Sequence, residues 1–351
     1  MAKFSIHIVS WNSARVLADA LESLRAQTFK DFTLTVVDNA STDGSVDVVR
    51  ERLPEATVLR NFKNLGFSAG QNQAIELARN RWVDDDKKGR SSVDRYVLVM
   101  NPDIILTPDF LEKLARGVDG RYEVGSATGK LLRVRRSRVE GGDPEFTDVI
   151  DSAGLVMKRN RRAADRGAGE KDGPAYAAPT EVFGVSGALA LYRAEAIDAL
   201  REVSGEVFDA DFFAYKEDVD VAWRLRLLGW KAAYVPQAVA YHYRGTGGAE
   251  KAGLLEMFKR RLGRSAMVNR LSTRNHLLML AKDDDWSNRL LHALWIVPHE
   301  IGKFLSTLFL SPRALIAYWE ALLLTPKMWK KRRALMRARK ADAKAIRAWF
   351  K

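Results

Sequence analysis

The sequence predicts an α/β protein built on a mostly parallel sheet with helices on both faces. Runs rich in β-branched and aromatic residues alternate with stretches whose apolar residues recur at helical spacing. Such alternation is typical of strands that lie side by side and are joined by helices. In the first hundred residues the predicted strands are 4–10, 32–37, 57–60 and 95–100, and the predicted helices are 16–27, 45–53 and 68–79.

The second half continues this pattern and then changes to helices alone. We predict strands at 183–192 and 234–241 and a helix at 218–228. Beyond about residue 247, apolar residues follow helical spacing throughout. The sequence therefore predicts an α/β domain over 1–246 and a helical, basic, amphipathic region over 247–351. The predicted loops, rich in charged residues and glycine, are 82–93, 135–143 and 159–173.

Composition excludes several classes of protein. Hydrophobic residues make up 47% of the 351 residues and charged residues 29%, which excludes a disordered chain. Cysteine is absent, so disulfides and thiolate metal sites are excluded, and a reducing compartment fits. The first residues run directly into a predicted strand and lack the apolar core of a signal peptide. We therefore expect a cytoplasmic protein.

The net charge of +13 is concentrated at the C-terminus. Residues 326–351 contain eleven Lys and Arg and one acid, Asp342, and so carry +10 of it. An anionic membrane surface or a nucleic acid would be attracted by such a segment. The tail has few aromatic residues and no recognised RNA-binding motif, which argues against nucleic acid as the partner.

Apolar residues along the same tail favour the membrane. They form one edge of an otherwise basic helical stretch, the composition of an interfacial helix. We expect this edge to lie on the inner face of the plasma membrane; the alternative is that these helices pack on the α/β domain and leave a solvated charged end. No predicted helix spans a membrane, because charged residues interrupt every apolar run. The edge consists of Met328, Trp329, Leu335, Ile346, Trp349 and Phe350.

Polar residues gather where predicted strands end, the edge at which parallel sheets bind ligands. Asp38 and Asn39 follow one strand, and Asp43 can cap the next helix; the residues alone leave ligand binding and simple capping equally open. The glycine-containing segment 61–72 permits close approach of a ligand but is, by itself, better explained as an ordinary strand-to-helix loop.

Two further elements suggest chemistry. Asp103, in Asn101-Pro102-Asp103, follows a strong strand, where a carboxylate suits a hard divalent ion, although such turns are common. Glu217, Asp218 and Asp220 place three carboxylates in four positions, and such crowding is one way to tune a general base.

Taken in order, these segments resemble family 2 glycosyltransferases with the GT-A fold, and most closely the bacterial rhamnosyltransferase-like branch. The resemblance covers about residues 4–245 and continues weakly through "RNHLLMLAK". It is carried by "SWNSARVL", "VVDNASTDGS", "NLGFSAGQN", "LVMNPDI", "FGVSGALALYR", "FDADFFAYKEDVDVAWRLRLLGW" and "YHYRG".

The resemblance implies a role for each matching residue. Asp38 would hold the base or ribose of a dTDP- or UDP-sugar, helped by Ser10, Asn12, Asn39 and Asn64. Gly187 and Ala188 would line the sugar and the acceptor.

It also implies a metal site and a base. Asp103 and His242 would bind Mg²⁺ or Mn²⁺, with Asn101 standing where the family pattern has a second acid. Asp218 would be the general base, with Glu217 as a supporting acid or acceptor contact. Asp220 and Arg224 are more simply explained as an i, i+4 pair that braces the helix.

The function implied is an inverting, metal-dependent transfer of a sugar, for which rhamnose is one candidate. The acceptor would be a cell-surface glycan or a polyprenyl-linked glycan. The alternative is a non-catalytic membrane-docking protein with a degenerate glycosyltransferase fold.

Overall fold

The computed structural model describes the chain except for residues 1–3, 90–93, 136–143, 244–262 and 264. Its main sheet has the strand order β10-β12-β6-β11-β4-β1-β2-β3. Strands β3, β2, β1 and β4 are parallel, β11 runs antiparallel between β4 and β6, and β12 is parallel to β6. The path strands are β1 (Phe4–Ser10), β2 (Phe32–Asp38), β3 (Thr57–Arg60), β4 (Tyr96–Met100), β6 (Val124–Arg135), β10 (Thr180–Val182), β11 (Leu189–Arg193) and β12 (Lys231–His242).

Helices cover both faces of this sheet, as predicted. The core on one face is closed by α1 (Ala14–Arg25), α2 (Ser45–Arg52) and α4 (Phe110–Val118). The core on the other face is closed by α3 (Gly66–Lys87), α5 (Ala194–Ser204) and α6 (Glu217–Leu227). Strand β4 shows why both faces are covered, because Val97 and Val99 enter one core while Leu98 and Met100 enter the other.

Several smaller strands complete the α/β part and were not predicted. β5 (Ile104–Leu106) pairs with β12, β7 (Glu145–Ser152) pairs with β6, and β8 (Leu155–Met157) pairs with β9 (Ala163–Asp165). The predicted loop at 159–173 is therefore wrong in part, because β9 lies within it. The predicted strand at 183–192 is too long, since only Leu189–Arg193 forms β11 and 183–188 approach it as a turn.

Helix α3 is also longer than predicted. Residues 82–87, predicted as a loop, are helical because Trp82 extends the buried stripe of Ala78 into the core. The consecutive acids Asp84, Asp85 and Asp86 occupy the remaining turn without breaking it. Most of the predicted loop 135–143 and the predicted domain boundary at 246–247 lie outside the described residues.

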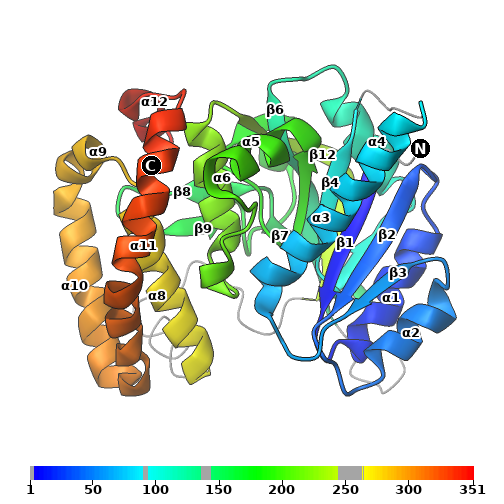
Figure 1. Ribbon diagram of the computed structural model, residues 1–351, viewed down its shortest axis with the longest axis horizontal. Helices are drawn as coiled ribbons and strands as arrows, with labels where there is room; N and C mark the ends of the chain where they lie inside the picture. The colour runs from blue at the N-terminus through cyan, green and yellow to red at the C-terminus, as the bar shows by residue number, and fades with distance from the viewer. Residues whose placement is uncertain (1–3, 90–93, 136–143, 244–262, 264) are drawn as a thin grey trace.

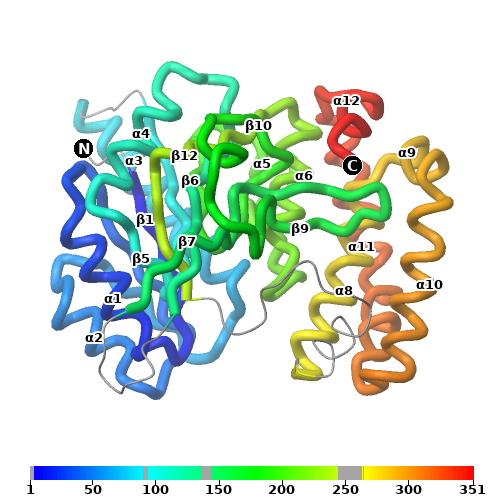
Figure 2. Tube along the Cα trace, turned by 180° about the vertical axis from the view of Figure 1, so that it is seen from behind, coloured from blue at the N-terminus to red at the C-terminus, as the bar shows by residue number. Residues whose placement is uncertain are grey.

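The C-terminal region is helical, as predicted, and stands beside the sheet at the end opposite to β3 (Figures 1 and 2). Helix α8 packs against α6 and α11, and α11 also contacts α5. No described helix is long and apolar enough to cross a membrane. The helices are α8 (Ala266–Asp283), α9 (Trp286–Leu291), α10 (Ala293–Leu310), α11 (Ile316–Ala338) and α12 (Ala343–Arg347), with the short turn η3 (Pro312–Leu315) before α11.

The apolar edge predicted for the tail is wrong at most of its residues. Met328, Leu335, Ile346 and Phe350 are buried in the core shared with the α/β part. Trp349 packs against that core and lies under the guanidinium of Arg226, whose Cζ is 4.0 Å from the ring centroid. These side chains hold the tail on the α/β part, so they cannot face lipid.

A different part of the helical region exposes apolar side chains, which we call the outer apolar surface. It runs along α9, α10 and the first turns of α11, and no exposed charged residue lies between positions 290 and 310. Leu294 is 83% exposed and Phe309 is 75% exposed. The outer apolar surface consists of Leu290, Leu291, Leu294, Val297, Ile301, Phe304, Leu305, Leu308, Phe309, Ile316, Trp319, Leu322 and Leu323.

Candidate active site

The carboxyl ends of β1 and β2 bring Ser10 and Asp38 together, as the parallel register pairs these residues directly. Both are buried. Oδ2 of Asp38 accepts the N–H of Ser41 at 3.2 Å. Among the described residues, Oδ1 of Asp38 and Oγ of Ser10 have no hydrogen-bond partner. Buried acceptors without donors are costly, so this corner is suited to a ligand that brings N–H or O–H groups.

The three predicted asparagines brace the loops around that corner. Asn12 adopts a positive φ of 51° and accepts the N–H of Thr42 at 2.9 Å. The Asn39 amide donates to the carbonyl of Gly66 at 3.0 Å, and Asn64 accepts the N–H of Gly66 at 2.8 Å. Their side-chain amides are thus used to fix the loops, whereas Ser10 and Asp38 keep polar atoms available.

Asp103 lies in the turn between β4 and β5, where it meets His242. Strand β5 pairs Ile104 with His242, which places the imidazole beside the turn. Nε2 of His242 is 3.3 Å from Oδ1 of Asp103, and Nδ1 is 2.7 Å from Oδ2 of Asp151. Burial alone would lower the pKa of His242, but the carboxylates of Asp103 and Asp151 raise it to about 9.

Asp151 is a site residue that the sequence did not reveal. It lies at the end of β7, a strand that was not predicted, and only the β6–β7 pairing brings it to His242. A carboxylate on the second ring nitrogen fixes the tautomer and orientation of a metal-binding histidine. Its only sequence signal is the alternation of the segment around it, which ends on buried residues 150–152.

The pair Asp103–His242 fits a divalent cation. Oδ1 of Asp103 is buried and receives no well-aligned hydrogen bond from the described residues. A cation that displaces the Nε2 proton of His242 would find a carboxylate oxygen and an imidazole nitrogen facing one another, which suits Mn²⁺ and, through oxygen, Mg²⁺. The described residues contain no group of three or more acidic, histidine or cysteine side chains placed to hold a metal. Oxygens of a bound substrate or of water can complete the coordination of such an ion.

Asp218 lies in the first turn of α6 and contacts the turn before β11. Its Oδ2 accepts the N–H of Gly187 at 3.1 Å. A Cβ at Gly187 would lie 3.1 Å from Cβ of Asp218, so only glycine allows this approach without displacement. The adjacent carbonyl of Ala188 accepts the N–H of Asn101 at 2.8 Å. One short turn therefore connects the predicted base with the turn that carries Asp103.

The loop before α6 is held in an unusual conformation. Phe213, Tyr215 and Lys216 all have positive φ, between 63° and 72°. The amide of Asn275, on α8, donates to the carbonyls of Phe212, Ala214 and Tyr215, each at 2.8 Å. Such conformations persist only where the surroundings hold them, and here the C-terminal region does so.

The same loop also reaches the start of α3, where the carbonyl of Gly66 accepts from Asn39 beside Asp38. The carbonyl of Phe213 accepts the N–H of Ser68 at 3.1 Å. Gly66 has φ of 84°, and a Cβ there would lie 2.5 Å from that carbonyl oxygen. The loop thus connects the base to the start of α3.

The three acids of α6 occupy different environments. Burial and the charge of Asp218 raise the pKa of Glu217 to about 8, which keeps Glu217 protonated at neutral pH. Asp218 is partly exposed. Asp220 is buried and pairs with Arg224 at 2.6 Å, as predicted, and with Lys282 of α8 at 2.5 Å.

Comparison with known proteins agrees with this geometry. Residues 5–201 match the family model described as "Glycosyl transferase family 2". The chain is 29% identical to the N-acetylglucosaminyl-diphospho-decaprenol L-rhamnosyltransferase of Mycobacterium tuberculosis, over 67% of this chain and 74% of that protein. It is 28% identical to the rhamnosyltransferase WbbL of Escherichia coli, over 51% of this chain and 61% of that protein.

The fold also matches a solved glycosyltransferase. The crystal structure of GalNAc-T7 with UDP, GalNAc and Mn²⁺ aligns with a TM-score of 0.54 and 12% identity, over 80% of this chain and 48% of that one. Because the family model covers more than half of the chain, the protein belongs to glycosyltransferase family 2 and is a glycosyltransferase of the rhamnosyltransferase-like kind.

Proposed function

We propose that the protein catalyses an inverting, metal-dependent transfer of rhamnose from a nucleotide-sugar to a lipid-linked glycan. The observation that carries this proposal is the turn at 187–188, which donates to Asp218 on one side and binds Asn101 on the other. Two hydrogen bonds thereby connect the proposed base with Asn101, two residues before the candidate metal ligand Asp103. The names of the relatives support both the sugar and the class of acceptor.

In this reaction an acceptor hydroxyl attacks the anomeric carbon from the face opposite the leaving diphosphate. The bond from that carbon to the diphosphate oxygen breaks, and the hydroxyl proton passes to Asp218. The N–H of Gly187 keeps the carboxylate oriented toward the acceptor. Burial and the charge of Asp218 raise the pKa of Glu217 to about 8, so Glu217 is protonated at neutral pH and adds no second negative charge beside Asp218.

Asp38 and Ser10 would receive the hydrogen-bond donors of the nucleoside at the sheet edge. A divalent cation held by Asp103 and His242 would neutralise the charge that develops on the departing diphosphate. Asp151 orients His242 for that role. The described residues favour this enzyme over a non-catalytic docking protein, because a degenerate site has no need of the buried, unpartnered oxygens of Asp38 and Ser10.

A panel of nucleotide-sugars tests the reaction. We expect dTDP-rhamnose with Mn²⁺ or Mg²⁺ to raise the melting temperature and to release nucleoside diphosphate on addition of a polyprenyl-diphosphate-linked glycan. The anomeric configuration of the product, read by NMR, should be opposite to that of the donor. Retention of configuration, or turnover unaffected by EDTA, would contradict the mechanism.

We further propose that the protein works at the cytoplasmic, inner face of the plasma membrane and docks there through the outer apolar surface. This surface lacks exposed charge from 290 to 310, and α11 continues from it into exposed cations such as Lys327, Lys330 and Arg333. Apolar contact flanked by cations is the arrangement that binds anionic leaflets.

Vesicle flotation tests the docking surface. Leu294→Asp and Leu323→Asp should release the protein from vesicles that contain anionic lipid, since each buries a charge in the headgroup region. Val83→Asp, at an exposed apolar position on α3, is the matched control and should float like the unaltered protein. Flotation that survives both changes on the outer apolar surface would place the contact elsewhere.

A further inference from the structure

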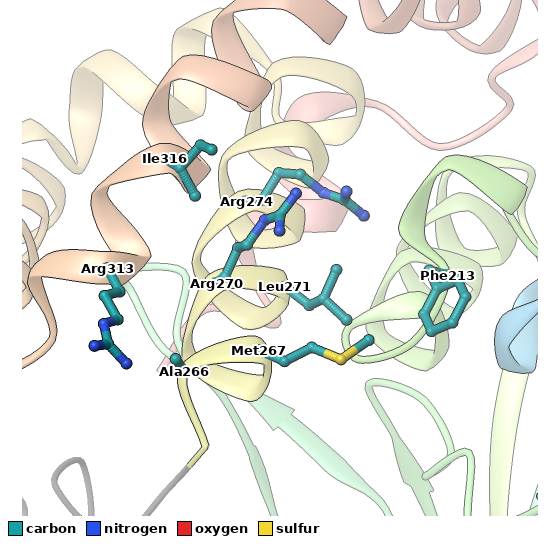
Figure 3. Close-up of a pocket in the computed structure, with 8 residues that line it drawn as sticks. All are labelled: Phe213, Ala266, Met267, Arg270, Leu271, Arg274, Arg313 and Ile316. Carbon is teal, nitrogen blue, oxygen red and sulfur yellow. The ribbon is translucent and has the colours of Figure 1, made fainter.

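A groove crosses the N-terminal half of α8, between the loop before α6 that contains Phe213 and the start of α11 (Figure 3). Its cavity volume is about 540 Å³. Its lining includes neither Ser10 and Asp38, which form the corner at the ends of β1 and β2, nor the candidate metal ligands Asp103 and His242. Its lining consists of Phe213, Ala266, Met267, Arg270, Leu271, Arg274, Arg313 and Ile316.

We propose that this groove binds the diphosphate and the first isoprene units of the lipid-linked acceptor. The proposal rests on the proposed function, which requires an acceptor to approach Asp218, and it names where the lipid part of that acceptor lies. Such a ligand combines a dianionic group with a branched apolar chain, and the groove offers partners for both.

The charge of the groove suits a diphosphate. Three arginines line it. Among the described residues, Glu320 accepts from Nε of Arg270 at 3.0 Å and also from its Nη2, and lies 4.0 Å from Nη1 of Arg274. Arg274 also donates to the carbonyls of Asp211 and Phe212, so its guanidinium already holds the backbone of that loop. Arg313 is exposed and makes no hydrogen bond or salt bridge with any described residue. Arg313, and Nη1 of Arg270, the nitrogen that Glu320 does not engage, can therefore bind phosphate oxygens.

The apolar part of the groove suits an isoprenoid. In Figure 3, Met267 and Leu271 point from α8 toward Phe213, while Ile316 lies on the α11 side. Met267 is 56% exposed and Ile316 is 48% exposed, so both have surface to cover. Methionine adapts its shape to irregular apolar ligands at little cost.

The two ends of the groove adjoin different parts of the molecule. Phe213 lies in the strained loop that leads into Asp218 and is tied to α3 through Ser68. Ile316 begins α11, whose following turns expose Trp319, Leu322 and Leu323 of the outer apolar surface. The groove therefore lies between the outer apolar surface and the loop that leads to Asp218.

Binding of geranylgeranyl diphosphate by the full-length protein tests the assignment. The titration is made in EDTA, so that the metal-dependent donor site does not hold the diphosphate. We expect geranylgeranyl diphosphate to bind at least tenfold more tightly than either inorganic diphosphate or geranylgeraniol. Arg313→Gln and Arg270→Gln should each weaken it about tenfold, the effect of losing one charge-assisted hydrogen bond. Ile316→Asp should weaken it as well.

Matched controls separate groove contacts from general charge. Arg337→Gln, at an exposed arginine in the last turn of α11, and Val83→Asp on α3 should bind the lipid as the unaltered protein does. Equal weakening by Arg337→Gln would overturn the assignment, as would equal affinity for inorganic diphosphate or for geranylgeraniol. Melting curves of each variant establish that it is folded.

The two proposals can fail separately. The titration requires neither a nucleotide-sugar nor turnover. Lipid binding that depends on Arg313, in a protein that transfers no sugar to any acceptor, would overturn the proposed function and leave the groove assigned. Sugar transfer to a lipid-linked acceptor, with binding insensitive to Arg313→Gln and Arg270→Gln, would overturn the groove and leave the function.

Discussion

The two faces of α6 carry carboxylates only two residues apart that have opposite character. Asp218 is partly exposed, accepts one N–H from Gly187, and faces the turn that leads to Asp103. Asp220 is fully buried between Arg224 and Lys282, and Asp209 binds the same lysine at 2.6 Å. Acidic residues that are close together in a sequence can therefore have different roles. Burial with cations produces a structural ion pair, whereas a partly solvated carboxylate can exchange protons.

The largest expected effect is on the reactive face. Asp218→Asn should lower turnover roughly 10²–10⁴-fold, because an amide cannot accept the hydroxyl proton. The melting temperature should change little, since the amide oxygen can still accept from Gly187. Steady-state assays and a donor thermal-shift titration measure both. Retained turnover would remove Asp218 from the role of base.

On the structural face, the effect should be on stability. Asp220→Ala leaves Arg224 and Lys282 buried beside one acid fewer and should reduce the free energy of unfolding by about 3–5 kcal/mol. Asp198→Ala is the matched control: its ion pair with Arg79 is far more exposed, and its loss should cost at most about 1 kcal/mol. Denaturant unfolding measures the two. Similar losses of unfolding free energy in the two variants would show that the buried ion pair of α6 stabilises the fold no more than an exposed one.

A smaller effect should follow from changing Asp151, which contacts the candidate metal ligand His242. Asp151→Asn should weaken Mn²⁺ binding about 10–100-fold, because the carboxylate orients His242 without contacting the metal. Donor binding in EDTA should be unchanged. Asp148→Asn, on the same strand and in a surface pair with Lys171, should leave Mn²⁺ binding as it was. Isothermal titration separates these outcomes.

The smallest effect concerns Glu217, which lies between the two faces. Its pKa rises from the ordinary 4.5 to about 8 in the folded protein, so the folded state holds this proton over a pH range in which the unfolded chain has lost it. Its contribution to stability is therefore complete below about pH 4.5 and is lost as pH rises through about 8. The slope is at most about 1.4 kcal/mol per pH unit.

Glu217→Gln removes that titration. The variant should show a flatter dependence of melting temperature on pH between about 5 and 8 than the unaltered protein. Parallel curves for the two proteins would mean that Glu217 does not carry the proton. The difference between the curves isolates this group, since all other titrating residues are shared.

The sequence predicted the parallel half of the fold well and the antiparallel half poorly. Strand β4 is an uninterrupted apolar run because both of its faces are buried, and β1 and β2 carry Phe, Ile, Leu and Val at alternate positions. Strand β6 contains Gly125, Ser126, Thr128 and Gly129, which mask its strand character. Gly129 is required there because a Cβ would lie 2.2 Å from the carbonyl oxygen of Ala238.

The residues of the candidate site also differ in how far the sequence alone reveals them. Residues that end predicted strands, such as Asp38 and Asp103, were found because strand ends are visible in the sequence. The sequence does not reveal Asp151, Lys282 and Asn275, because each meets its partner only through pairing or packing of segments 60 to 91 positions away. The misassigned tail has the same cause: Ile346 and Phe350 look like a lipid-facing edge until the surface that covers them is known.

The three hydrogen bonds from Asn275 to the loop before α6 have a practical consequence for chimaeric enzymes. The side chain that fixes the backbone before Asp218, the proposed base, belongs to the helical region, while Asp218 itself belongs to the α/β part. Exchanging C-terminal halves between relatives, in order to change which glycan is extended, would sever that support. A working hybrid would have to move residues 212–216 together with α8 as one transplanted unit.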